Sequence, residues 1–303
     1  MARPLIVPLD GSPDAEYALP WALRLAEVSG AAISLVTVHS EPAVYLDGQT
    51  MVGSLVPDDA IRTREMEYLE NLGNRIATPQ LQIKAEVLSG GVVPALLDAA
   101  ELANAYCVIL TPHQRGAIAR FFLGSTAMEF IRESKVPVLV VHPKEGEVNL
   151  LQKPQVRHIL VPLDSSPLAE QVLPYAADLA KTFGASIELL LVLDGVPDAE
   201  GLLALHEPGL PGPWDPTVMK AKAERYLEHL AKELRNKGIT TNSLVISHGR
   251  ADEVIESTAN SFNDTLIALA THGRGGLAKV VWGSVADKVI RNSAHPTLIF
   301  RPA

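Results

Sequence analysis

The sequence predicts two tandem α/β domains, each an open five-stranded parallel sheet with helices on both faces. Three observations lead to this fold class. Apolar runs of strand length alternate with segments of helical periodicity, which is the order of a parallel sheet with crossover helices. The strand segments are continuously apolar, as strands covered on both faces are. The chain of 303 residues also repeats itself once, and domains of roughly 100–200 residues are typical.

The internal repeat sets the domain boundaries. Residues 5–13 read LIVPLDGSP and residues 159–167 read ILVPLDSSP, with six of nine positions identical. Gly124-Ser125 recurs as Gly283-Ser284 near the end of the second copy. The stretch between the copies is polar and contains proline, which is typical of a linker. We therefore predict a first domain over residues 1–144, a linker over 145–154 and a second domain over 155–303.

The elements of the first half follow in chain order. Leu5–Leu9 is a short apolar run that ends at Asp10, and we expect a buried strand there. Ser12 can cap the helix that follows, with Pro13 at its first position and Gly30 at its end. The further elements expected are strands at Ile33–Val38, Ile83–Leu88, Cys107–Leu110 and Val136–Val141, and helices at 60–76, Val92–Ala103 and Gly124–Ser134. The second half repeats this order.

The composition excludes several classes of protein. The net charge is −9, from 35 acidic and 26 basic residues, and no basic stripe is present. This argues against nucleic acid and against an anionic membrane surface as partners. Cys107 is the single cysteine, so no intramolecular disulfide can form, and its apolar neighbours indicate a buried small side chain. No apolar run reaches the length of a membrane span, and we expect a cytoplasmic protein.

The loop after the fourth strand of the second half is rich in glycine. It contains Gly273-Arg274-Gly275-Gly276, and Gly283-Ser284 follows where the next helix begins. Glycines let backbone N–H groups approach an anion closely, and a helix N-terminus favours a phosphate. Together they suggest a triphosphate cradle. Tight turns also use glycine, so the residues alone leave a purely structural role open.

These motifs resemble the universal stress protein family. The ATP-binding members of that family carry G-x-x-G-x9-G-[ST], and this chain has Ala270-x-x-Gly273-x9-Gly283-Ser284, with alanine in place of the first glycine. The strand-one end VPLD, with Asp164, is also similar. The resemblance covers essentially the whole chain, once per half. It implies a flavodoxin-like or HUP-type fold and a nucleotide-binding protein of the stress response.

The resemblance also implies a set of ligand contacts in the second half. Asp164, in the strand-one motif with Pro162, would lie near the adenosine and can position a Mg²⁺ carried by ATP. Val192 would meet the adenine through its backbone, and Ala270 would approach the ribose. The phosphate contacts implied are Gly273, Gly283, Ser284 and Val285. His272 and Arg274 lie beside the phosphates in this scheme; His272 either contacts them or stabilises its loop, and Arg274 either reaches them or is solvated.

The first half departs from the motif. Thr111 stands where the first glycine belongs and Gln114 where the second belongs, and Pro112 between them has no N–H to donate. Asp10 and Gly124-Ser125 persist. We therefore predict that the first half binds ATP poorly or not at all. Its candidate contacts are Asp10, Val38, Gly124 and Ser125.

Three functions remain in consideration. The first is an ATP-binding regulatory protein whose nucleotide state is recognised by an unknown protein partner. The second is a slow ATPase or another nucleotide-dependent enzyme, for which His272 is the one nearby candidate base. The third is a scaffold that binds no nucleotide. The fifth strands of the two halves are expected to pair as an intrachain pseudo-dimer, or alternatively two chains pair as a homodimer.

Overall fold

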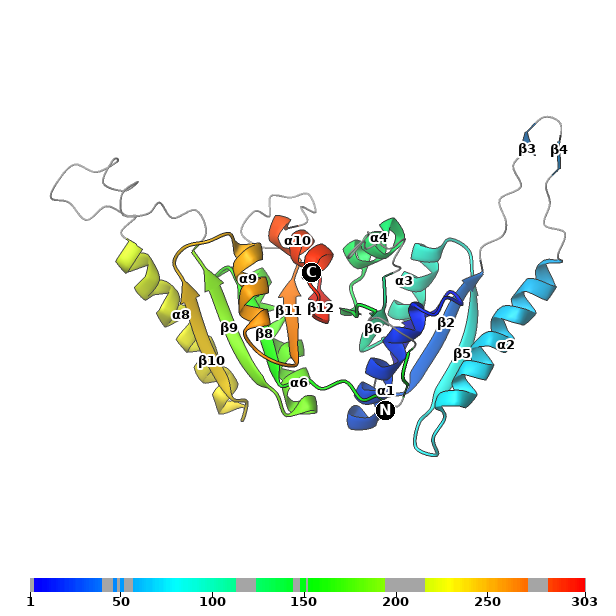
Figure 1. Cartoon of the computed structure of the whole chain (residues 1–303), viewed down its shortest axis with the longest axis horizontal. Helices are drawn as coiled ribbons and strands as arrows, with labels where there is room; N and C mark the ends of the chain where they lie inside the picture. The colour runs from blue at the N-terminus through cyan, green and yellow to red at the C-terminus, as the bar shows by residue number, and fades with distance from the viewer. Residues whose placement is uncertain are drawn as a thin grey trace. The chain divides into compact units, whose positions relative to one another are not determined.

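The computed structural model describes residues 3–39, 46–47, 50–51, 57–112, 124–143, 148–150, 152–193, 216–271 and 283–302. The chain divides into two compact units, Met1–Pro154 and Gln155–Ala303. Each unit is an α/β domain with its own sheet and its own helices (Figure 1). We call them the N-terminal unit and the C-terminal unit.

The N-terminal unit contains a parallel sheet in the order β5-β2-β1-β6-β7. Its strands are β1 (Leu5–Pro8), β2 (Ile33–His39), β5 (Ile83–Ser89), β6 (Cys107–Leu110) and β7 (Val138–Val140). Its helices are η1 (Ala15–Ala18), α1 (Leu19–Ser29), α2 (Asp58–Ile76), α3 (Val92–Leu102) and α4 (Ser125–Glu133). A small antiparallel pair, β3 (Leu46–Asp47) and β4 (Thr50–Met51), lies in the connection between β2 and α2.

The C-terminal unit repeats the arrangement, with strand order β10-β9-β8-β11-β12. Its strands are β8 (His158–Leu163), β9 (Ser186–Val192), β10 (Thr241–Ile246), β11 (Thr265–Ala270) and β12 (Thr297–Phe300). Its helices are α5 (Pro167–Glu170), α6 (Leu173–Phe183), α8 (Pro216–Asn236), α9 (Ala251–Asn260) and α10 (Ser284–Asn292). The predicted fold class is confirmed in both units. When the strands are numbered along the chain within a unit, their order is 3-2-1-4-5. This is the order of the first five strands of the doubly wound Rossmann sheet, and it differs from the order 2-1-3-4-5 of flavodoxin.

The helices cover both faces of each sheet. Right-handed crossovers put α1 and α2 on one face of the N-terminal sheet and α3 and α4 on the other, and α3 contacts α4 as α9 contacts α10. The central strands are therefore buried on both sides. Ile6 on β1 and Leu160 on β8 are each 1% exposed, which explains why these strands have no polar face.

The first helix differs from the expectation. A single helix from Ser12 to Gly30 was expected, but the segment is split into η1 and α1. Pro20 lies in the first turn of α1, and Pro174 lies in the first turn of α6. A proline has no N–H to give to a carbonyl one turn earlier, so a continuous helix cannot pass through it. The expectation that Pro13 opens the helix is wrong in the N-terminal unit, whereas Ser166 and Pro167 do open α5 in the C-terminal unit.

Cys107 is buried, as its apolar neighbours in the sequence indicate, and it forms no disulfide. Burial raises the pKa of its thiol to about 12, so this side chain serves as a small core residue. Within the part of the chain that the structure describes, no helix has the length and apolar character needed to cross a bilayer.

Candidate functional site

The crevice of the N-terminal unit begins where β1 and β6 stop pairing. The N–H groups of Leu5 and Leu9 donate to carbonyls on the β2 side, so Ile6 and Pro8, which alternate with them, face β6. Ile6 pairs with Val108, but Pro8 has no N–H for the next rung. The β1–β2 ladder continues to Pro8 while the β1–β6 ladder ends at Ile6. The two strands therefore separate at their carboxyl ends, at the point where the strand order reverses and where such sheets bind ligands.

A cavity of about 780 Å³ occupies this crevice. It lies at the carboxyl ends of β1, β2 and β6 and is bounded by α2, α3 and the N-terminus of α4. The four candidates from the first half, Asp10, Val38, Gly124 and Ser125, all line it. Sequence reasoning missed its apolar wall, which includes Leu96 and Phe130, because nothing in the pattern distinguishes these positions from other core residues.

Each unit forms the same turn after its first strand. Asp10 Oδ1 accepts a hydrogen bond from Ser12 N at 3.0 Å, and Asp164 Oδ1 accepts one from Ser166 N at 3.0 Å. The residue between them has positive φ, 81° at Gly11 and 65° at Ser165. This turn holds each aspartate at the end of its central strand, where Asp10 lines the cavity. The C-terminal unit forms it although Ser165 bears a Cβ, which makes positive φ costly.

The start of the last helix differs between the units. Gly283 N donates to Thr271 O at 2.9 Å, and a Cβ on Gly283 would lie 3.0 Å from that oxygen. At Gly124 a Cβ would meet no atom of the described residues within 4 Å. The glycine is therefore required by close packing in the C-terminal unit, where it joins the N-terminus of α10 to the end of β11. Ser284 and Ser125 are the exposed first residues of α10 and α4.

The remaining candidates of the second half lie at the same edge of the C-terminal sheet. Val192 ends β9 and Ala270 ends β11, and these strands lie on either side of β8. Pro162 is near the carboxyl end of β8, two residues before Asp164. Val285 lies in the first turn of α10. His272, Gly273 and Arg274, and Gln114 in the first half, lie outside the described residues.

A charged cluster at the end of β2 was not predicted from the sequence. His39 is 2% exposed; its Nε2 lies 2.7 Å from Asp58 Oδ1 and its Nδ1 lies 2.8 Å from Glu65 Oε2. The hydrogen bonds to Asp58 and then Glu65 raise the pKa of His39 against the opposing effect of burial. A ring with both nitrogens on carboxylates is satisfied when both carry protons. Glu65 also lines the cavity, so this cluster belongs to its wall.

A signal for this cluster exists in the sequence. Asp58 and Glu65 are seven residues apart on one helix, which places them on one face, and His39 directly follows the apolar run of β2. The corresponding positions of the second half are Leu193, Pro216 and Ala223, none of which titrates. The cluster is therefore a feature of the N-terminal unit alone.

The C-terminal unit has a different charged group beside its last helix. Asp252, on α9, accepts from Lys288 Nζ on α10 at 3.3 Å and from Arg250 at 2.9 Å. Burial acts to raise the pKa of Asp252, but the hydrogen bond from Lys288 and the charge of Arg250 outweigh it, so the pKa is lowered. The contact between Asp252 and Lys288 links α9 to α10, the helix that Gly283 precedes.

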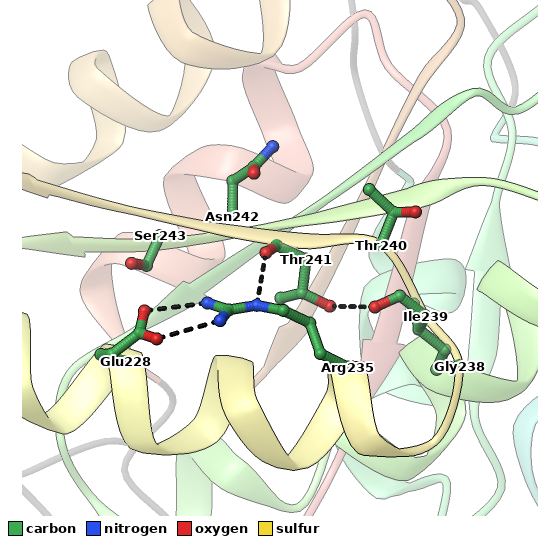
Figure 2. Close-up of a pocket in the computed structure, with 8 residues that line it drawn as sticks. All are labelled: Glu228, Arg235, Gly238, Ile239, Thr240, Thr241, Asn242 and Ser243. Atoms are coloured by element: carbon green, nitrogen blue, oxygen red, sulfur yellow. Dashed lines mark hydrogen bonds and ion pairs between the residues drawn. The ribbon is translucent and has the colours of Figure 1, made fainter.

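A second hollow, at the amino end of β10, is a weaker candidate. Figure 2 shows Arg235, on α8, between Glu228 and the main chain of Thr241. The guanidinium donates to both Glu228 oxygens, at 3.0 and 2.8 Å, and to Thr241 O at 3.1 Å. Arg235 and Glu228 already neutralise each other, and this hollow lies away from the carboxyl ends of the strands. Among the residues the structure describes, no group of histidine, cysteine and carboxylate side chains is placed to hold a metal ion.

Comparison with known proteins identifies relatives over nearly the full length. The model of the "Universal stress protein family" matches residues 1–142 and 155–301. Universal stress protein Rv2005c of Mycobacterium tuberculosis (strain ATCC 25618 / H37Rv) is 27% identical over 98% of this chain and 96% of its own. A universal stress protein of Mycolicibacterium smegmatis is 26% identical, covering 98% of this chain and 97% of its own.

A solved structure agrees on the fold. The crystal structure of a universal stress protein from Archaeoglobus fulgidus DSM 4304 matches with a TM-score of 0.68 at 18% identity, covering 99% of this chain and 96% of that chain. At this identity the likeness concerns the architecture. It supports the strand order and the tandem arrangement described above.

Proposed function

Because the chain belongs to the universal stress protein family, we propose that it is a cytoplasmic, ATP-binding regulatory protein of the stress response. ATP binds mainly in the C-terminal unit, and a partner protein recognises the nucleotide-bound state. The contacts proposed are Pro162, Asp164, Val192, Ala270, His272, Gly273, Arg274, Gly283, Ser284 and Val285. A Mg²⁺ carried by the nucleotide lies near Asp164. The pairing of the fifth strands into a pseudo-dimer and the linker at residues 145–154 remain part of this proposal.

The observation that carries the proposal is the close junction of β11 and α10. Gly283 holds the N-terminus of α10 within 2.9 Å of the Thr271 carbonyl. Among the described residues no side chain caps α10, so its first N–H groups remain suited to a phosphate. The motif Ala270-x-x-Gly273-x9-Gly283-Ser284 spans this junction. The residues present thus fit the phosphate end of a nucleotide.

The test is calorimetric titration of the full-length, nucleotide-stripped protein with ATP and Mg²⁺. We expect one ATP per chain, lost in Gly283→Asp and weakened in Ser284→Ala. The matched controls are Gly124→Asp and Ser125→Ala in the N-terminal unit, which should keep the ATP stoichiometry. Circular dichroism and the melting temperature establish that each variant is folded.

The other outcomes separate the alternative functions. Two ATP molecules per chain, with equal loss in both sets of variants, would contradict the preference for the C-terminal unit. Folded protein without ATP binding would favour the scaffold. Release of phosphate from bound ATP at a rate abolished by His272→Ala would favour the slow ATPase.

A further inference from the structure

The outer edge of β10 is not paired in the part of the chain that the structure describes. β10 is the last strand of the C-terminal sheet and pairs there with β9 alone (Figure 1). The carbonyls of Thr240 and Ile246 accept hydrogen bonds from N–H groups on the β9 side. The even-numbered residues of β10 therefore turn their main chain toward β9, and the odd-numbered residues turn theirs outward. Such an edge is a template on which another strand can pair.

The outward main-chain groups of β10 belong to Thr241, Ser243 and Val245. Thr241 O is already occupied, because Arg235 Nε donates to it at 3.1 Å (Figure 2). Among the described residues, the N–H and C=O groups of Ser243 and Val245 have no hydrogen-bond partner. Two donors and two acceptors are therefore open, and Arg235 closes the edge at the amino end of the strand.

The side chains of β10 lack the charges that usually prevent pairing of an edge strand. In the N-terminal unit the edge strand is β5, where Lys84 and Glu86 form an ion pair at 2.6 Å on the exposed surface. Charged side chains of this kind discourage association of edges. β10 reads TNSLVI and has no charged residue. Leu244 occupies in β10 the place that Glu86 has in β5, as the strand registers show, and it is 40% exposed.

The open groups of β10 are self-complementary about a two-fold axis at Leu244. In an antiparallel pair of two β10 strands centred there, Ser243 of each copy lies opposite Val245 of the other. Both of these pairs exchange two N–H···O=C hydrogen bonds, which uses every open main-chain group of the two strands. The two Leu244 residues then form the non-hydrogen-bonded pair between them, where opposed side chains come closest. A patch that meets itself in this way makes the isologous contact of a two-fold dimer.

The length and charge of the edge favour β10 itself over a foreign strand. In the symmetric pair, β10 of the second copy ends at Ile246, opposite Asn242, and so stops before the occupied carbonyl of Thr241. A longer strand would run into the Arg235 side chain. Glu228 and Arg235 are the charged residues that line the hollow beside this edge, and they neutralise each other. The surroundings therefore do not select a charged partner.

We propose that the β10 edge is an interaction surface for a second copy of this chain, joined by antiparallel β10–β10 pairing centred on Leu244. The inference goes beyond the proposed function. It requires no nucleotide, and it concerns a different strand from the fifth strands of the two units.

The first experiment is sedimentation velocity of the full-length, nucleotide-stripped protein over a wide range of concentration. We expect a monomer–dimer equilibrium. Leu244→Glu introduces the residue of β5 and places like charges directly opposite each other, so it should weaken dimerisation about tenfold. The matched control Glu86→Gln, on the edge of β5, should leave the equilibrium unchanged. Because Leu244 is partly exposed, its variant should fold, and circular dichroism checks this.

The second experiment tests the register of the pairing. Leu244→Cys should give a disulfide-linked dimer when oxidised with diamide, because Cα atoms of a non-hydrogen-bonded pair lie about 4.5 Å apart, within reach of a disulfide. The matched control is Ser243→Cys. The two Ser243 residues lie on a diagonal of roughly 7–8 Å, which is beyond that reach. Cys107 is buried and should not link chains. Non-reducing gel electrophoresis measures the linked fraction.

Three results would overturn the proposal. These are a monomer at every concentration, a dimer whose stability Leu244→Glu leaves unchanged, and equal linking of Ser243→Cys and Leu244→Cys. Failure of the proposed function has a different signature, since protein that binds no ATP would still dimerise through β10.

Discussion

The two units share the turn after the first strand but differ in the residues that surround it. Asp10 and Asp164 make the same 3.0 Å contact two residues along the chain. Asp10 lines one cavity with Glu65 of the His39 cluster and with Gly124, which no described residue approaches closely, whereas the C-terminal unit packs Gly283 against Thr271 O. The shared turn is therefore part of the scaffold, and the differing residues are those that give each unit its own surroundings at the carboxyl end of the central strand.

The tyrosine of the second helix supports this division. Tyr68 OH donates to Glu16 at 3.4 Å, and Tyr226 OH donates to Glu170 at 2.9 Å. Burial, followed by the charge of Glu16, raises the pKa of Tyr68 well above its usual range. The same contact in both units joins α2 or α8 to the segment after the turn, so it belongs to the scaffold as well.

The largest effect expected tests whether the units lose stability separately. Ile6→Ala and Leu160→Ala each remove a side chain that is 1% exposed at the same place on the central strand. Each should cost about 3 kcal/mol of unfolding free energy in its own unit, because a cavity is left in the core. Hydrogen exchange followed by mass spectrometry on peptides from each unit measures this. If either variant lowered protection equally in both units, the units would not lose stability separately.

A smaller effect is expected where the units differ in packing. Gly283→Ala should destabilise the C-terminal unit by about 1.5 kcal/mol, because the Cβ would press on a backbone oxygen. Gly124→Ala should be neutral or stabilise by up to about 0.5 kcal/mol, since its backbone is compatible with alanine and no atom of the described residues would meet the added Cβ within 4 Å. Urea unfolding of the two variants measures both. A destabilised Gly124→Ala with an unaffected Gly283→Ala would reverse our interpretation.

The capping serines should give a still smaller difference. Ser166 Oγ accepts from Ala169 N at 3.1 Å and caps α5, whereas Ser12 Oγ accepts from Ala15 N at 3.3 Å before a 3-10 turn. Ser166→Ala should cost about 1 kcal/mol. Ser12→Ala should cost about half of that, because its contact is longer and lies outside the helix it precedes. The melting temperatures of the two variants measure this difference. A lower melting temperature for Ser12→Ala than for Ser166→Ala would contradict the expected order.

The smallest effect is confined to a range of pH. Because Asp58 and Glu65 raise the pKa of His39 in the folded protein, protonated His39 stabilises the N-terminal unit. This contribution is complete below the unfolded pKa of about 6.5 and is lost as the pH rises through the folded-state pKa. His39→Gln should flatten the decline of the melting temperature above that pH. A decline of the same size in the variant would exclude His39 as its source.

The sequence was sufficient to predict the fold but only part of the crevice. The alternation of apolar strands and helices and the repeat of VPLD predicted both sheets, because local periodicity and repeats are carried by neighbouring residues. The break before α1 departs from the single helix that the apolar spacing predicts, because Pro20 has no N–H to continue a helix from the preceding turn. The His39 cluster was missed because its members come from β2 and α2, and their meeting depends on tertiary packing.

The candidate contacts of the first half were identified more fully than their surroundings. Asp10, Val38, Gly124 and Ser125 line one cavity, since each lies at the carboxyl end of a strand or the start of a helix, and these meet at one edge of a parallel sheet. Leu96 and Glu65 also line it. Leu96 reaches the cavity from α3 and Glu65 reaches it from α2. Both placements depend on how these helices pack on the sheet, which a sequence pattern does not predict.

Pro8 has a consequence for the rate at which a ligand would enter the crevice of the N-terminal unit. Because the proline itself ends the β1–β6 ladder, the gap between these strands is built into the sheet and needs no hydrogen bond to break before a ligand enters. Such a preformed wedge lowers the reorganisation cost of association. The rate of entry past these two strands should then depend on encounter rather than on opening of the sheet.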